Sequence, residues 1–282
     1  MTYKKNVPSC VYDRWIKLNP DYTIDFSMDE DCIKFLADNF NPYIVDLFKN
    51  IKRGMYKADL WRLCKLYMNN GVYTDVDIIP YMKLADIIPY DNTFYSCISV
   101  MPASIFQAFI VNNLPKKHPL LLIMIMSFII NKPTDHMNGP TYDMYTCLCH
   151  TFNVPRIYPH RKYSANNVKI KIKLWTSNSN FKHINLNYFP DDIKYRVELI
   201  PNFLEKIKCI FIIDNNILIV NRIDKNCGWN YIHYCNIIFD IPVNMYMYSE
   251  NGVPFGSNQY VSHNNRKILN SRDYNYFANS GW

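Results

Sequence analysis

Two aspartates, Asp75 and Asp77, are separated by a single valine within the segment N-G-V-Y-T-D-V-D-I-I-P of residues 70–80. Residues two apart in an extended strand point to the same side, so a strand over residues 72–79 brings both carboxylates to one cleft. Paired carboxylate oxygens suit Mg²⁺ or Mn²⁺, which also bind phosphate oxygens. Such a cation can neutralise a departing diphosphate as a Lewis acid.

The residues around the two aspartates make this interpretation more specific, because a D-x-D tripeptide alone is common on solvated surfaces. The neighbouring residues that predict a buried strand are Val72, Val76, Ile78 and Ile79. Two adjacent carboxylates at the tip of a buried strand are costly unless a cation compensates their charge. The buried context therefore makes a metal site a stronger interpretation than the D-x-D tripeptide alone would.

A second pair of charged residues, Asp59 and Arg62, lies upstream at a spacing of three residues. In a helix this spacing places both side chains on one face. One interpretation is a surface ion pair worth a few tenths of a kcal/mol. The other is a sugar-binding pair, in which Asp59 accepts hydrogen bonds from hydroxyl groups and Arg62 donates several. The spacing alone favours the ion pair.

Hydrophobic spacing predicts the elements that position these residues. We expect helices over residues 11–18, 57–68 and 120–130, strands over residues 94–99, 104–110 and 168–174, and a β-hairpin over residues 210–220. The helix, turn and strand of residues 57–80 form the αβ unit of an α/β sheet, in which ligands bind at the carboxyl ends of strands. We expect an α/β domain over residues 1–160, a smaller β-rich C-terminal module over residues 161–240 and a tail over residues 241–282.

The composition of the 282 residues, 49% hydrophobic and 20% charged, indicates a folded globular chain. The net charge of +7 is spread along the chain without a dense basic run, so nucleic acid is not an expected partner. No apolar run reaches the roughly 20 residues of a transmembrane segment, and no secretory signal is visible. Scattered cysteines predict reduced thiols. We therefore expect a soluble, cytoplasmic protein.

Several motifs together resemble the DXD-containing glycosyltransferases related to yeast initiation α-1,6-mannosyltransferase (glycosyltransferase family 32). They are W-x-x-L-N-P-D-Y at residues 15–22, K-A-D-L-W-R at residues 57–62, the D-x-D segment at residues 70–80, K-K-H-P-L-L at residues 116–121 and N-G-P at residues 138–140. The order and spacing of these motifs match the family, and so do their residue types. The resemblance covers roughly residues 7–160. Abundant Asn, Ile, Tyr and Lys are also typical of AT-rich genomes such as those of some viruses, for which the host cytoplasm or the virion is the expected location.

The resemblance implies a GT-A fold, which is a Rossmann-like nucleotide-sugar-binding domain, and Mn²⁺ or Mg²⁺ as cofactor. It implies a nucleotide-sugar donor, a glycan, glycoprotein or glycolipid acceptor, and transfer of a hexose with retention. By the same resemblance Asp75 and Asp77 bind the metal, with Asp75 also near the ribose, while Asp59 and Arg62 bind the donor sugar. Ala58 and Tyr73 are expected in the donor pocket.

Related enzymes often close the donor site with residues near the chain end. The resemblance gives His263 and Ser280 as further metal ligands and Trp282 as a donor contact. The family also usually opens with a strand of the type I-P-K-I-I-H-Q-x-W, and here only MTYKKN precedes the first matching helix. This difference leaves open a second interpretation, a catalytically degenerate protein that binds nucleotide sugars or glycans.

Overall fold

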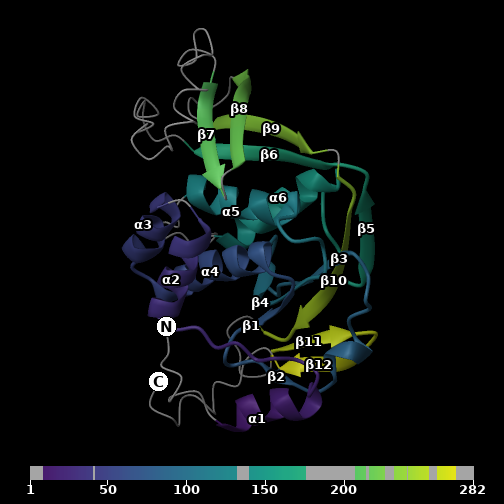
Figure 1. The fold of residues 1–282 in the computed structure, drawn as a ribbon. Coiled ribbons are helices and arrows are strands. Elements are labelled where there is room, and N and C mark those ends of the chain that lie inside the picture. The colour runs from purple at the N-terminus through teal and green to yellow at the C-terminus, as the bar shows by residue number, and fades with distance from the viewer. Residues whose placement is uncertain are drawn as a thin grey trace.

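A computed structural model describes residues 9–40, 42–131, 140–175, 207–213, 216–225, 232–239, 241–253 and 259–270. Its helices are α1 (Ser9–Leu18), α2 (Asp29–Asn39), α3 (Pro42–Asn50), α4 (Gly54–Met68), α5 (Pro119–Asn131), α6 (Pro140–Thr151) and the 3₁₀ helix η2 (Leu84–Asp86). The helices expected over residues 11–18, 57–68 and 120–130 are confirmed as α1, α4 and α5. Together with the strands below they confirm the α/β class (Figure 1).

Twelve strands are described. They are β1 (Gly71–Thr74), β2 (Ile79–Pro80), β3 (Thr93–Ile98), β4 (Ile105–Asn112), β5 (Arg161–Ala165), β6 (Val168–Trp175), β7 (Ile207–Ile213), β8 (Asn216–Lys225), β9 (Ile232–Phe239), β10 (Val243–Asn251), β11 (Tyr260–His263) and β12 (Arg266–Asn270). The strands expected over residues 94–99, 104–110 and 168–174 are confirmed as β3, β4 and β6. The pairing of β7 with β8, Ile213 opposite Asn216, confirms the expected hairpin.

The main sheet has the strand order β1-β4-β3-β10-β11-β12-β2, with β5 paired to β10. Strands β1 and β2 therefore stand at opposite ends of this path, although only residues 75–78 connect them in the sequence. A connection this short requires the sheet to curl until its two ends approach each other. The segment that closes this gap is the one that carries Asp75 and Asp77.

The pairing in this sheet differs from the mainly parallel sheet of a Rossmann-like domain. Among the strand pairs that the structure describes, β3–β10 is parallel and the other pairs of the main sheet are antiparallel. The short connections from β3 to β4, from β10 to β11 and from β11 to β12 require this, because a parallel pair needs a long crossover. The main sheet is therefore mixed and curled.

Hydrophobic burial divides the molecule into two cores, one on each face of the curled sheet. The outer core lies between the sheet and helices α2–α6 and includes Leu60, Leu63, Ile110 and Met245. The inner core includes Ile78, Phe109, Tyr248, Val261 and Leu269. Because Ile78 is fully buried in the inner core, burial of apolar surface anchors the segment that follows the two aspartates.

The second sheet has four strands in the order β6-β9-β8-β7, and β6 lies against α5 and α6 (Figure 1). It falls within the β-rich module expected over residues 161–240. The predicted boundary near residue 160 does not separate the two sheets, however, because β5 belongs to the main sheet and the chain returns to that sheet at β10. Strands β10–β12 place part of the expected tail, residues 243–251 and 260–270, in the main sheet as well. The alternation of buried and exposed residues in β10 explains this return, because its buried side chains need the cover of the sheet's neighbours.

Within the described part of the chain, the helices are too short or too polar to traverse a lipid bilayer.

Candidate functional site

Helix α4 and strand β1 place the predicted sugar-binding pair beside the first aspartate of the D-x-D segment. The last turn of α4 ends at Met68, and Gly71 begins β1 with φ +134°, a conformation that favours glycine. This turn directs β1 back along the helix, so that Tyr73 packs on the same outer core as α4. The guanidinium of Arg62 lies 4.5 Å from the ring centre of Tyr73.

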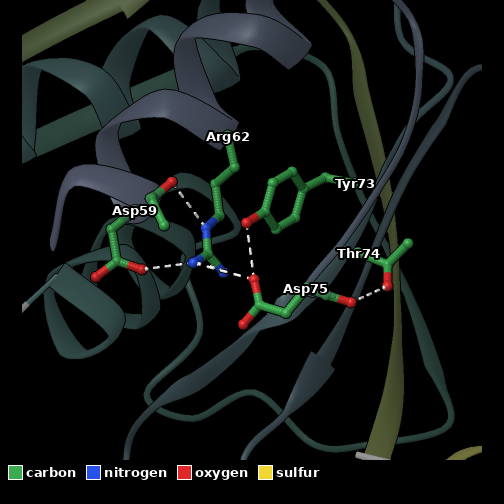
Figure 2. Close-up of polar contacts among 6 residues, drawn as sticks. Asp59, Arg62, Tyr73, Thr74 and Asp75 are labelled. Carbon is green, nitrogen blue, oxygen red and sulfur yellow. Dashed lines mark hydrogen bonds and ion pairs between the residues drawn. The ribbon is translucent and has the colours of Figure 1, made fainter. Parts of the chain in front are cut away.

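Arg62 joins the two motifs that the sequence singled out (Figure 2). Its Nη2 lies 3.2 Å from Oδ1 of Asp59 and 3.4 Å from Oδ1 of Asp75. Its Nε donates to the carbonyl oxygen of Ala58 at 3.1 Å, which fixes the plane of the guanidinium. The Tyr73 hydroxyl donates to the same Oδ1 of Asp75 at 2.7 Å. The surface ion pair that spacing alone favoured is therefore wrong, because Asp59 and Arg62 are buried.

Burial separates the roles of the two carboxylates that contact Arg62. The side chain of Asp59 is 9% exposed, whereas that of Asp75 is 34% exposed. Burial raises the pKa of Asp59 to about 6. The positive charge of Arg62 lowers this pKa, and the negative charge of Asp75 raises it. For Arg62, burial disfavours the charge, but the nearby carboxylates of Asp75, Asp59 and Asp77 outweigh it and raise the pKa. One cation is thus shared among more negative groups than it can neutralise.

The D-x-D segment is a turn and not an extended strand. Strand β1 ends at Thr74, and the amide of Ile78 donates to the carbonyl oxygen of Asp75 at 3.2 Å. The single strand predicted over residues 72–79 is therefore interrupted at residues 75–78, because the chain must turn there to reach β2 at the other end of the sheet. The alternation argument for Asp75 and Asp77 fails with it. Asp77 is nevertheless close enough to Arg62 to act on its charge.

One carboxylate oxygen of Asp75 is available to a divalent cation. Arg62 and Tyr73 both contact Oδ1 of Asp75, and Oδ2 has no contact within the described residues; Figure 2 shows it turned away from Arg62. The described residues contain no group of three His, Cys, Asp or Glu side chains placed to hold a metal. Two carboxylates suffice where substrate phosphates complete the coordination, as is common for Mg²⁺. The second oxygen of Asp75 is therefore available to a cation that binds together with a phosphate-bearing ligand.

Helix α1 holds the turn from the inner side of the sheet, a role that sequence reasoning did not assign. The indole Nε1 of Trp15 donates to the carbonyl oxygen of Ile78 at 2.9 Å. Asn19 accepts a hydrogen bond from the amide of Leu84 at 2.7 Å. Both residues belong to the motif W-x-x-L-N-P-D-Y, and a hydrogen-bonding tryptophan and asparagine in one motif were the only signal of this role. Because the two contacts are buried, they fix the segment on both sides of β2.

His263, which the resemblance offered as a metal ligand, has its contacts elsewhere and not in this cluster. Nδ1 of His263 lies 3.1 Å from the hydroxyl of Tyr246, and its ring packs against Tyr248 and His160. Burial lowers the pKa of His263, and His160 lowers it further. In the hairpin of β11 and β12, His263 pairs with Arg266, whereas the opposite end of that hairpin pairs with β2. Ser280 and Trp282 lie outside the described residues.

Comparison with known proteins finds similarity over the segment that contains this cluster. Residues 6–94 match the family model described as a glycosyltransferase sugar-binding region containing the DXD motif. An uncharacterized glycosyltransferase of Acanthamoeba polyphaga mimivirus is 27% identical over 77 residues, which cover 27% of this chain and 31% of the relative. The aligned part thus spans about a third of that relative's length. No solved structure matches the chain. The resemblance to DXD-containing glycosyltransferases is confirmed, and the matched segment contains the whole Arg62 cluster.

Proposed function

We propose that this chain, which carries the sugar-binding region of DXD-containing glycosyltransferases, transfers a hexose from a nucleotide-sugar donor to a glycan, glycoprotein or glycolipid acceptor. The observation that carries the proposal is the position of Arg62, buried between Asp59 and Asp75 at the D-x-D turn. This cluster has more negative than positive groups and leaves one oxygen of Asp75 without a partner among the described residues. It is therefore suited to a ligand that brings both a cation and hydroxyl groups, as a nucleotide sugar with its metal does.

Asp75 and Asp77 are the proposed ligands of Mn²⁺ or Mg²⁺. When bound, the cation would neutralise negative charge on the leaving diphosphate. Arg62 and Tyr73 would hold Oδ1 of Asp75, so that the orientation of the carboxylate is set before any ligand arrives. Outer contacts of this kind tune and orient a ligating group. We assign Arg62 and Tyr73 this positioning role.

Asp59 and Arg62 are the proposed contacts of the donor sugar. Oδ1 of Asp59 faces Arg62, and a carboxylate can accept further hydrogen bonds from sugar hydroxyls. The carbonyl of Ala58 already holds Nε of Arg62, which leaves the other nitrogens of the guanidinium for the carboxylates and the donor. Ala58 and Tyr73 would line the donor pocket next to this pair.

Transfer with retention is part of the proposal. The bond between the anomeric carbon and the diphosphate oxygen breaks, and a bond from the acceptor oxygen to the same face of that carbon forms. The departing diphosphate oxygen takes the proton of the acceptor hydroxyl, so no base from the chain is required. The enzyme then acts by positioning the reactants and by stabilising charge. A GT-A-like domain built on the curled sheet belongs to the same proposal.

A donor screen tests this function directly. The full chain is incubated with UDP-glucose, UDP-galactose, UDP-N-acetylglucosamine and GDP-mannose, each with and without Mn²⁺. We expect Mn²⁺-dependent hydrolysis of one donor, accompanied by a rise in melting temperature, because a ligand that binds the folded chain stabilises it. A rise in melting temperature without hydrolysis or transfer would indicate the degenerate binding protein instead. Neither response with any donor would contradict the proposal.

A further inference from the structure

A buried glutamine lies next to the D-x-D turn with its amide group unpaired. Gln107 in β4 is 3% exposed, and neither its Nε2 nor its Oε1 has a hydrogen-bond partner within the described residues. A buried amide without partners is destabilising, because it loses its hydrogen bonds to water and gains none in return. Such a group is unusual in a folded chain and calls for an explanation.

Another buried amide on the same strand shows the ordinary arrangement. Nδ2 of Asn112 donates to the carbonyl oxygen of Leu66 at 2.8 Å, and its Oδ1 accepts from the amide of Leu114 at 3.2 Å. Asn112 thereby joins β4 to α4. Gln107 has no such contact with the part of the chain that the structure describes, so a structural role of the kind that Asn112 has does not explain it.

The strand pattern places Gln107 on the face of the sheet that carries the Arg62 cluster. Its neighbours Phe106 and Ala108 both pack in the inner core, so the side chain between them lies on the opposite, outer face. Tyr73, which packs on the outer core, shares that face.

Gln107 is also close to the turn along the strand. The amide of Asp75 donates to the carbonyl oxygen of Ala108 at 3.0 Å, which continues the pairing of β1 with β4. Gln107 is therefore the next residue of β4 beyond the position opposite Asp75. An unpaired amide thus lies one residue along β4 from the position that pairs with the partly exposed Asp75.

We propose that Gln107 is a specificity-determining residue, whose side-chain amide binds hydroxyl groups of the sugar that is transferred. This inference rests on the proposed function. A neutral amide both donates and accepts hydrogen bonds, and the hydroxyls of a sugar do the same. The diphosphate offers acceptors only and is better matched by a cation. A site with a buried amide discriminates strongly against a sugar that lacks the matching hydroxyl, because the amide then stays unpaired.

The test compares Gln107→Met with Asn112→Leu, two changes that remove a buried amide from the same strand. Calorimetric titration gives the dissociation constants of the preferred nucleotide sugar from the donor screen and of its free nucleoside diphosphate, both with Mn²⁺. For Gln107→Met we expect a nucleotide-sugar dissociation constant roughly three- to tenfold higher, an unchanged nucleotide dissociation constant and a melting temperature at or above that of the wild type. Asn112→Leu should lower the melting temperature and leave both dissociation constants unchanged.

A measurement on the wild type alone covers the case in which Gln107→Met folds poorly. The ligands are deoxy analogues of the nucleotide sugar, each lacking one hydroxyl. We expect one analogue to bind the wild type weakly, with a dissociation constant similar to that of the complete donor for Gln107→Met. The inference is overturned if Gln107→Met binds the nucleotide sugar as the wild type does, if it weakens nucleotide and nucleotide sugar equally, or if no deoxy analogue loses affinity. A wild type that binds no nucleotide sugar would instead contradict the proposed function.

Discussion

At the scale of single residues, the site depends on one guanidinium that several negative groups share. Arg62 contacts Asp59 and Asp75 from a buried position, and Asp77 adds its charge from the turn. Removing a buried charge from such a cluster leaves its partners uncompensated, which is usually more costly than the loss of a surface ion pair. The same arrangement leaves Asp59 as the group whose protonation the fold changes most clearly.

Asp59 gives the protein a dependence of stability on pH that an asparagine would remove. Burial raises its pKa from 3.8 to about 6, so the folded chain binds more protons than the unfolded chain between these values. Its contribution to the free energy of unfolding therefore falls as the pH rises through this window. Asparagine does not titrate, so the free energy of unfolding of Asp59→Asn should lack this fall. Between pH 4 and pH 7 the difference between variant and wild type should therefore shift by roughly 1 to 3 kcal/mol in favour of the variant. Urea unfolding at several pH values measures this, and two parallel curves would contradict it.

Tyr73 tests whether the orientation of Asp75 matters for the metal. Tyr73→Phe removes the hydroxyl that donates to Oδ1 of Asp75 and keeps the ring beneath Arg62. We expect the Mn²⁺ dissociation constant, measured by electron paramagnetic resonance with a nucleoside diphosphate present, to rise roughly tenfold. Because Asp75 is partly exposed and water can replace the hydroxyl, the melting temperature should change little. An unchanged Mn²⁺ affinity would show that Arg62 alone suffices.

At the scale of elements, the D-x-D turn connects β1 to β2 and is fixed at Ile78. The side chain of Ile78 is buried in the inner core, and its carbonyl oxygen accepts a hydrogen bond from Trp15 of α1. Trp15→Phe removes the indole donor and leaves the carbonyl of Ile78 unpaired. We expect a loss of about 1 to 2 kcal/mol in the free energy of unfolding, together with a higher Mn²⁺ concentration at half-maximal donor hydrolysis. The control is Trp61→Phe, because Trp61 packs against Phe35 at 5.1 Å between ring centres. Equal effects of the two changes on Mn²⁺ would contradict a specific role for Trp15.

The elements that the sequence predicted correctly are those set by local patterns. Helix α4 follows from its apolar stripe, and the β7–β8 hairpin from two apolar runs around Asn216. The continuous strand predicted through residue 79 was wrong. The apolar residues Val76 and Ile78 alternate with polar ones as in a strand, but a turn that buries Ile78 gives the same sequence pattern. The site residues Asp59, Arg62 and Asp75 were found by motif. The contact between Arg62 and Asp75, however, depends on how α4 and β1 pack, which residue spacing does not encode.

At the scale of the whole molecule, the site exists because distant parts of the chain close one sheet. Strand β3 pairs with β10 in parallel, Tyr95 opposite Tyr246, and β12 pairs with β2 next to the D-x-D turn. These contacts join residues far apart in the sequence, and no local pattern predicts them. For this reason the sequence predicts a tail where β10, β11 and β12 lie, although these strands complete the sheet that positions the turn.

For the whole molecule, we propose that the D-x-D turn of this sheet serves metal-dependent sugar transfer. Asp77→Asn tests it most directly, with Asp86→Asn, an exposed carboxylate on η2, as the matched control. We predict that Asp77→Asn abolishes the Mn²⁺-dependent hydrolysis and transfer of the preferred donor and keeps a melting temperature close to that of the wild type, whereas Asp86→Asn retains full turnover. Undiminished turnover by a folded Asp77→Asn protein would contradict the account.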